Sequence, residues 1–289
     1  MSSSRAPVLY IPHSVRPAYL GPADFRQCPV EMFEQTSRMR PALLKLGDAL
    51  VAKKPKGFVV ISSYWANDDH GVAVNEDSTN PLVYKYDLRD RALTRSKLDG
   101  EFFNVRFTSH GDAAMLDAVK RALKDGNVPF ESKKRGLDNG VMFGEKTDIP
   151  IVQVSLYGED DIKLATELGK ALSAVRDQGY TLVCIGQPLT RPDTQSISDS
   201  ESMDYMRAVR DAVTADDPLK ATLALQDNPV FPKIPFKRDY QPLVVATAAV
   251  LPGDKSEIIA GGSDSVSRDY LGYDTGYEGP MGWVLSIHK

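Results

Sequence analysis

Apolar runs alternate along this chain with segments whose apolar positions recur every three or four residues. Short runs of this kind are typical of buried β-strands, and the spaced positions are typical of amphipathic helices. The pattern predicts strands at 8–11, 57–63, 149–156, 180–185 and 283–287, and helices at 29–54, 111–124, 161–177, 203–213, 219–225 and 243–251.

The order of these elements predicts an α/β fold with a mostly parallel central sheet that is flanked by helices. Residues 57–63 are an uninterrupted apolar run that ends in small polar residues, as central parallel strands do. Residues 243–251 are so apolar that we expect a buried helix there. Because we find no internal repeat, linker or low-complexity segment, we expect one domain over 1–289.

Composition narrows the classes of protein to which the chain can belong. Its 289 residues are 42% hydrophobic and 26% charged, as in proteins that bury a sizeable core. The net charge of −4 argues against a nucleic-acid partner or an anionic membrane surface. No apolar run reaches the length of about 18 residues that a membrane span needs. There is also no secretory signal, and Cys28 and Cys184 are too few for a disulfide framework. We therefore expect a cytoplasmic protein that acts on a small molecule, while the sequence does not determine its oligomeric state.

Polar residues follow several of the predicted strands. His13 comes after the first strand, Tyr64 and Trp65 after the second, and Gln187 after the strand at 180–185. Ligands of open α/β sheets bind at the carboxyl ends of the strands, so these side chains are expected to converge on one edge. The turn signal Asp138-Asn139-Gly140 precedes another strand. A capping or turn role is the alternative interpretation for each of these residues.

The sequence contains no familiar cofactor motif. We find no phosphate-binding glycine-rich loop, no HExxH, no CxxC and no GxSxG. Ser62 and Ser63 end a strand, but the residues that follow them are Tyr-Trp-Ala-Asn, without the glycines of a nucleophile elbow. We therefore expect no bound cofactor and no serine-hydrolase chemistry.

Several segments together resemble the class III extradiol ring-cleavage dioxygenase superfamily, especially its DOPA-extradiol dioxygenase type. The similar segments, in the order in which that family has them, are Pro7–Ser14 (the first strand and its His turn), Pro55–Trp65 (a strand that ends in Ser-(Ala/Ser)-His-Trp), Arg135–Gly140 (Arg-Gly-Leu-Asp-His-Gly), Asp148–Leu156 (the Asp-Ile-Pro-Val-Val-Gln strand), Leu182–Gly186 and Asp239–Leu243. They span nearly the whole chain, and they imply the fold of the catalytic subunit of these enzymes.

The same resemblance implies where a metal site would be. The family binds a divalent metal through histidines, or through two histidines and a carboxylate, and the matching positions here are His13, Tyr64 and Asp239. The positions of two further pocket histidines are occupied by Asn139 and Thr190. Only His13 is a histidine. A tyrosine is a poor ligand unless it is ionised, and its ordinary pKa is about 10.

From these replacements we predict a metal-independent enzyme for a small aromatic or polyketide-like molecule. Tyr64 would be the acid or hydrogen-bond donor, His13 the base or orienting group, and Asp239 the group that tunes His13. The expected substrate-binding residues are Asn139, Thr190, Gln187, Trp65 and Asp138. Suitable chemistry includes enolisation, cyclisation, retro-aldol cleavage, hydration or a pericyclic step. The alternatives are a metal-dependent ring-cleavage dioxygenase and a non-catalytic pseudo-enzyme that binds a small molecule or a partner.

Overall fold

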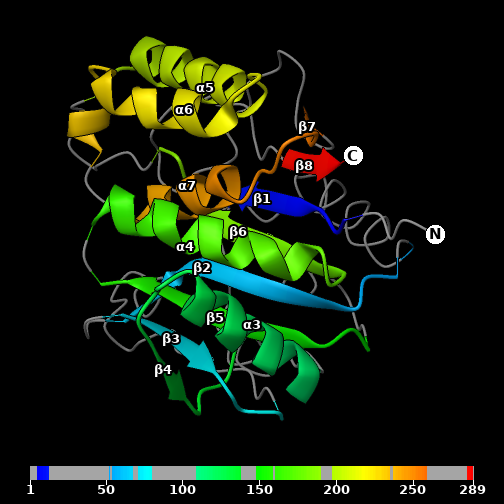
Figure 1. Cartoon of the computed structure of the whole chain (residues 1–289). Helices are drawn as coiled ribbons and strands as arrows, with labels where there is room; N and C mark the ends of the chain where they lie inside the picture. The colour runs from blue at the N-terminus through cyan, green and yellow to red at the C-terminus, as the bar shows by residue number, and fades with distance from the viewer. Residues whose placement is uncertain are drawn as a thin grey trace, which may run out of the picture.

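The computed structural model describes residues 5–12, 52, 54–67, 71–79, 109–137, 148–158, 160–189, 197–234, 237–258 and 285–288. Within these ranges, strands and helices alternate along the chain (Figure 1).

The strands form one mixed sheet of eight strands, in the order β4-β3-β5-β2-β6-β1-β8-β7. Their bounds are β1 Val8–Pro12, β2 Gly57–Asn67, β3 Val72–Asn75, β4 Phe130–Lys133, β5 Ile151–Tyr157, β6 Tyr180–Gly186, β7 Lys255–Ile258 and β8 Leu285–His288. The four central strands β5, β2, β6 and β1 are parallel, β4 is parallel to β3, and the other neighbouring pairs are antiparallel. The predicted α/β fold with a mostly parallel sheet is confirmed.

The register of the central strands brings their carboxyl ends to one edge of the sheet. Pro12, the last residue of β1, pairs with Gly186, the last residue of β6. On the other side of β6, Ser62 pairs with Ile185. The ends of β1, β2 and β6 therefore meet, as the sequence predicts.

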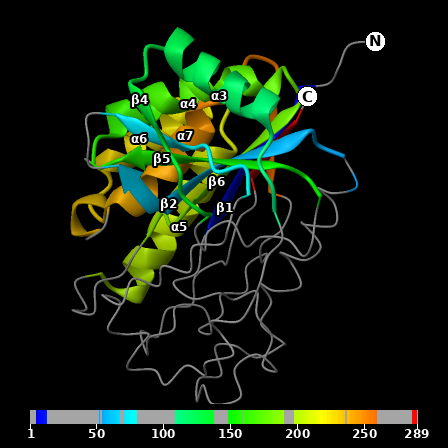
Figure 2. The same ribbon diagram turned by 90° about the horizontal axis from the view of Figure 1, so that it is seen from below.

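The longer helices are α3 Ala113–Asp125, α4 Ile162–Arg176, α5 Asp199–Val213, α6 Pro218–Ala224 and α7 Gln241–Ala248. The first four begin at side-chain caps, which are Asp112, Asp161, Ser198 and Asp217. Such caps satisfy backbone N–H groups that have no partner inside the helix. Helices α3, α4 and α7 lie on the same side of the sheet, whereas α5 packs on α6 and α6 packs on α7 (Figures 1 and 2).

The core lies between the sheet and these helices. Val59 and Ile61 of β2 and Leu182 and Cys184 of β6 belong to the same buried cluster as residues of α4 and α7. All residues of α7 are buried, which is the physical reason for its very apolar sequence. The predicted buried helix is thus present, although it begins at Gln241 and ends at Ala248 rather than spanning 243–251.

A buried ion pair holds the opposite, amino-terminal edge of the sheet together. Arg176, the last residue of α4, donates to Asp254 Oδ2 at 2.7 Å, and the two side chains are 1% and 0% exposed. Its guanidinium also donates to the backbone oxygens of Ala6 and Ala249. One side chain therefore links the start of β1, the end of α4 and the segment that follows α7.

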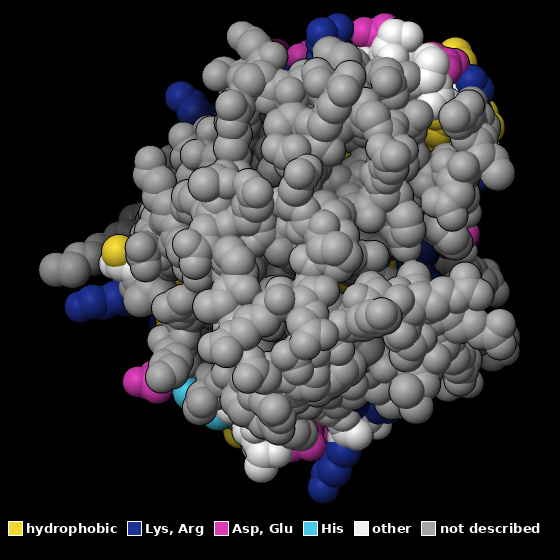
Figure 3. Space-filling model, turned by 180° about the vertical axis from the view of Figure 1, so that it is seen from behind, with side chains coloured by type: hydrophobic (Ala, Val, Ile, Leu, Met, Phe, Trp, Pro, Cys, Tyr) yellow, Lys and Arg dark blue, Asp and Glu magenta, His cyan; other side chains and the backbone are white. Residues whose placement is uncertain are grey.

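The main predicted elements are present, with bounds that differ by a few residues. The short strands β3, β4 and β7 were not predicted, and most of the helix expected at 29–54 lies outside the described residues. None of the described helices combines the length and the apolar composition that crossing a membrane requires. In the view of Figure 3, the described Lys and Arg side chains are spread around the margin among Asp and Glu, and those visible do not gather in one patch.

Candidate functional site

The backbone of Asp239 is held at the carboxyl end of β6 by a hydrogen bond and by close packing against Gly186. Gln187 follows β6, and its backbone N–H donates to the backbone oxygen of Asp239 at 2.8 Å. A Cβ atom at Gly186 would lie 2.5 Å from the same oxygen and 2.8 Å from Pro242 Cγ. The short 3-10 helix η7 (Lys237–Tyr240) can approach the strand only because residue 186 has no side chain.

The end of β2 is irregular where the sequence predicts the site. Relative to β5, its register shifts between Ile61 and Ala66, as in a β-bulge, and the shifted segment contains Tyr64 and Trp65. Bulges often redirect side chains beside active sites. Tyr64 is 42% exposed and is the one large apolar side chain that is exposed among the described residues. Its backbone N–H donates to Ser62 Oγ at 3.2 Å, which fixes the turn of the chain before it.

Trp65 is buried beneath a guanidinium group. The residue is 6% exposed. Arg135 Cζ lies 4.6 Å from the centroid of its ring, within the range of a cation–π interaction. This contact attaches the segment that begins at Arg135 to the end of β2. Asp138 and Asn139 follow soon after in the sequence, but they lie outside the described residues.

Two buried side chains near this edge each have one polar atom without a hydrogen-bond partner among the described residues. They are Ser63, which is 3% exposed, and Gln187, which is 5% exposed. The unpaired atoms are Ser63 Oγ and Gln187 Oε1. Since most buried polar groups in proteins are hydrogen-bonded, an unpaired group at a strand end indicates a place for a ligand or a water molecule.

The structure describes half of the site residues predicted from sequence. Gln187 and Asp239 are in contact through their backbones, while Tyr64 and Trp65 come from β2, which lies against η7. The other four, His13, Asp138, Asn139 and Thr190, lie outside the described residues, so their positions stay predictions. Sequence reasoning did not predict that the Ser63 hydroxyl is buried without a partner, because a small polar residue after an apolar run ordinarily signals only the end of burial.

The residues at the positions that match the family's metal ligands can be compared with what a metal site requires. The described members are Asp239 and Tyr64, a carboxylate and a phenol. No group of three or more His, Cys, Asp or Glu residues that could hold a metal is found within the described residues. The described positions thus supply two oxygen donors, and His13, the histidine of the matching set, lies outside the described residues.

Two other titratable groups near these strand ends stay neutral. Burial, together with the charges of Glu167 and Asp161, raises the pKa of Tyr157 to about 12. Burial also raises the pKa of the Cys184 thiol, which is fully enclosed in β6. A buried, protonated thiol is a poor nucleophile, so the cysteine contributes to packing.

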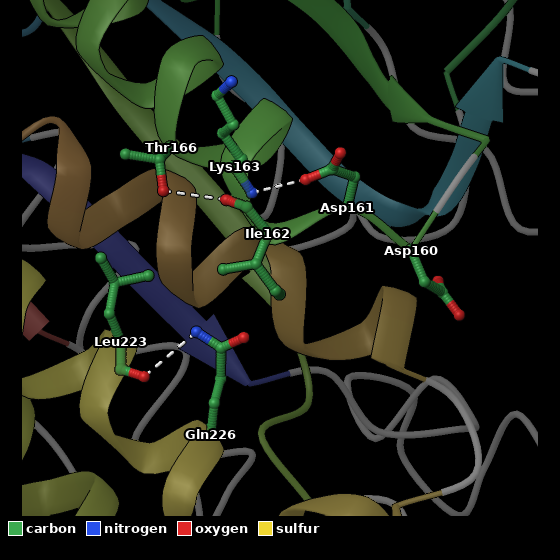
Figure 4. Close-up of a pocket in the computed structure, with 7 residues that line it drawn as sticks. All are labelled: Asp160, Asp161, Ile162, Lys163, Thr166, Leu223 and Gln226. Atoms are coloured by element: carbon green, nitrogen blue, oxygen red, sulfur yellow. Dashed lines mark hydrogen bonds between the residues drawn. The ribbon is translucent and has the colours of Figure 1, made fainter.

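A separate cleft of about 680 Å³ lies between the start of α4 and the end of α6 (Figure 4). It is lined by Asp160, Asp161, Ile162, Lys163, Thr166, Leu223 and Gln226. Several of its polar groups already bond to their own helices: Asp161 caps α4, Thr166 donates to Ile162 O, and Gln226 donates to Leu223 O. None of the described site residues lines this cleft, and its engaged polar groups make it a weaker candidate than the strand ends.

The chain is similar in sequence to several known dioxygenases. The chain is 26% identical to the 4,5-DOPA dioxygenase extradiol of Escherichia coli (strain K12) over 191 residues, which cover 64% of this chain and 60% of that protein. It is 24% identical to the 4,5-DOPA dioxygenase extradiol of Beta vulgaris over 48% of this chain and 50% of that protein, and 26% identical to a dioxygenase of Hapsidospora irregularis over 63% and 53%. The chain thus spans between half and three-fifths of the length of these relatives. No protein-family model matches it.

The fold has a counterpart among solved structures. The crystal structure of an uncharacterized protein of Escherichia coli K12 matches 99% of this chain and 100% of its own, with a TM-score of 0.63 and 19% sequence identity. At this identity the likeness concerns the fold alone, and it agrees with the α/β architecture described above.

Proposed function

We propose that this chain, which is similar to 4,5-DOPA extradiol dioxygenases, uses an extradiol-dioxygenase-like scaffold for metal-independent acid–base chemistry on a small aromatic or polyketide-like molecule. The observation that carries this proposal is the side chain at residue 64. At the strand end where the resemblance puts a metal-binding histidine, the chain has a tyrosine, exposed on an irregular segment beside the carboxyl edge.

Tyr64 is better suited to donate a hydrogen bond or a proton than to bind a metal. A phenol with an ordinary pKa of about 10 is protonated at neutral pH, so it can donate a hydrogen bond or a proton to an oxygen that gains negative charge. Asp239 supplies a carboxylate from η7, and His13, which follows β1, would be the base. The reactions that this set supports are enolisation, cyclisation, retro-aldol cleavage and hydration.

Metal-dependent ring cleavage is the second candidate, because the curated relatives are named as dioxygenases. It requires three metal ligands from this chain, and the described positions supply one carboxylate, Asp239, and one phenol, Tyr64. The first experiment therefore measures turnover of candidate cyclic phenols and polyketides before and after treatment with a chelator. Activity that is lost to the chelator and restored by a divalent metal would reject metal independence.

The second experiment tests Tyr64 itself. We expect Tyr64→Phe to lower turnover about tenfold to ten-thousandfold, the span of one acid–base or oxyanion group, while the fold is unchanged. His13→Ala should act similarly, and the double variant should lose much less than the product of the two effects. Tyr180→Phe is the matched control, because Tyr180 begins β6 at the opposite edge of the sheet. Wild-type turnover in both Tyr64→Phe and His13→Ala would show that the assignment is wrong.

A further inference from the structure

We propose that Arg135 is a positioning residue of the Tyr64 site: its guanidinium group, which lies over the Trp65 ring, fixes the irregular segment of β2 that carries Tyr64. This inference rests on the proposed function, because it concerns the acid of the same site. It assigns a role to a residue outside the set of candidate site residues. Arg135 acts through Trp65 and not on the substrate.

Within the described sheet, the segment that carries Tyr64 lacks the pairing that holds the rest of β2. Ile61 pairs with Val154 of β5, and the next pair is Ala66 with Leu156. Because β2 advances five residues between these pairs and β5 advances two, β2 has three extra residues here. The pairing of β2 with β6 also ends before Tyr64. Since ladder hydrogen bonds ordinarily hold a strand in place, the position of Tyr64 depends on other contacts.

Two such contacts are on either side of the Tyr64 side chain in the sequence. The Tyr64 backbone N–H donates to Ser62 Oγ at 3.2 Å, which closes a local turn. Arg135 Cζ lies 4.6 Å from the centroid of the Trp65 ring, in the range of a cation–π contact. Trp65 is 6% exposed, whereas Tyr64 is 42% exposed. The buried ring can therefore anchor the segment while the neighbouring phenol stays accessible.

Arg135 is itself anchored through its backbone. Its backbone N–H donates to Asn75 Oδ1 at 3.1 Å. Asn75 is the last residue of β3 and is 3% exposed. In the sheet, β3 and β5 lie between β4 and β2, so the contact of Arg135 with Trp65 joins parts of the chain that strand pairing does not join. Replacing the Arg135 side chain leaves its backbone bond to Asn75 in place.

Hydrogen exchange tests the anchor without any substrate. We expect the backbone amide of Tyr64 to exchange about two- to fivefold faster in Arg135→Met, the factor that one cation–π contact is worth. The amides of β6 should keep their wild-type rates, because only the local segment is released. Arg135→Lys should give an intermediate rate, since an ammonium keeps the charge but does not stack flat on a ring.

Arg207→Met is the matched control for these variants. Arg207 also loses a guanidinium group, but it lies on α5 in an exposed ion pair with Asp204 at 2.9 Å. Such pairs contribute little to stability. The exchange rate of the Tyr64 amide and the turnover should therefore stay at their wild-type values.

Turnover shows whether the anchor acts through Tyr64. We expect Arg135→Met to lower kcat about ten- to hundredfold with little change in KM, because a small misplacement of a reacting group has an effect of this size. In the Tyr64→Phe background, the same substitution should have almost no further effect, since the group that it misplaces is already absent.

Each outcome decides the inference. An unchanged exchange rate at Tyr64 in Arg135→Met overturns it, and so does an equal rise in β6, which would show a general loss of stability. It is also overturned if Arg135→Met lowers turnover by the same factor with and without the Tyr64 hydroxyl. Arg135→Lys is judged by the same criteria, so the inference can be refuted even if Arg135→Met does not fold.

Failure of the proposed function gives a different result. Wild-type turnover in Tyr64→Phe, together with faster exchange at Tyr64 in Arg135→Met, would reject the acid–base proposal and keep Arg135 as the anchor of this segment. Lost turnover in Tyr64→Phe with unchanged exchange in Arg135→Met would reject the anchor and leave the acid–base proposal standing.

Discussion

Gly186 controls how closely η7, and with it Asp239, approaches the strand ends. We expect Gly186→Ala to lower the free energy of unfolding by about 1–3 kcal/mol, because the new methyl group overlaps Asp239 O and Pro242. It should also lower turnover, since the backbone that carries Asp239 must move away. Chemical denaturation and kinetics on the same protein measure the two effects.

Gly169→Ala is the matched control for this variant. Its Cβ would lie 2.4 Å from Val245 O, an equally severe overlap, but between α4 and α7. It should lower stability and leave turnover at the wild-type value. Full activity in Gly186→Ala would contradict the role assigned to this close approach.

The Arg176–Asp254 pair makes stability depend on pH. Burial favours the neutral acid, but hydrogen bonds from Arg176 and from the Leu251 backbone, and the charge of Arg176, outweigh it and lower the pKa of Asp254. Its stabilising effect is therefore complete above the unfolded-state pKa of about 3.9 and is lost as the pH falls through the lower folded-state value.

We expect Asp254→Asn to destabilise the protein by about 3 kcal/mol at pH 7, because Arg176 keeps its charge in a buried site. The difference from the wild type should shrink below about pH 4, where Asp254 begins to be protonated in the unfolded chain, and should go on shrinking through the lower folded-state pKa. Urea denaturation at a series of pH values measures this difference. A difference that stays constant from neutral pH into strong acid would contradict the pairing.

For single residues, the sequence predicted where polar side chains lie better than it predicted their hydrogen-bond partners. The polar residues at strand ends could be identified because apolar runs stop there, and Gln187 does follow β6 directly. Tyr64 was also expected after its strand, but it lies inside β2, which continues past an irregular segment to Asn67. Whether a hydroxyl is paired depends on neighbours from distant segments, as with Ser155 and Ala73 of β3. For that reason the unpaired state of Ser63 could not be predicted from its local sequence.

Among the elements, α6 is joined to η7 by one buried hydrogen bond. Tyr240 Oη donates to Thr222 O at 2.7 Å, and the Tyr240 ring meets Phe231 edge-on at 5.1 Å. We expect Tyr240→Phe to cost about 1 kcal/mol of stability, because the acceptor loses this bond while the ring packing remains. Equilibrium unfolding in urea measures the loss.

Tyr205→Phe serves as the comparison for that change. Tyr205 is 1% exposed, and its hydroxyl has no partner among the described residues. Removing that hydroxyl should leave stability unchanged or raise it slightly. Equal losses in the two variants would show that the bond to Thr222 O contributes nothing measurable.

Element prediction succeeded where burial dominates the sequence. The strands β2, β5 and β6 are almost completely buried, so continuous apolar runs identified them. By contrast, β4 has the sequence Phe-Glu-Ser-Lys and β7 has Lys-Ser-Glu-Ile. Both strands are at the edges of the sheet, where one side has no neighbouring strand and polar residues are tolerated, so their hydropathy resembles that of loops.

For the whole molecule, the sheet order predicts unfolding as one unit. β1 pairs with β6 on one side and with β8 on the other, so a single sheet combines strands from the beginning, middle and end of the chain. We expect the near-UV and far-UV circular dichroism signals to change at the same temperature, in one cooperative transition. Two separated transitions would contradict the prediction of one domain over 1–289.

The pairing of β1 with β8 also determines which rearrangements of chain order the fold should tolerate. Val8 lies opposite Ile287 in antiparallel register, so the start of the first strand is beside the end of the last one. A short linker could join these strands, and new ends could be opened at the exposed turn of Gly126 and Asn127 after α3. Such a circularly permuted protein would keep every strand pairing and the carboxyl edge, because circular permutation changes only where the polypeptide is cut.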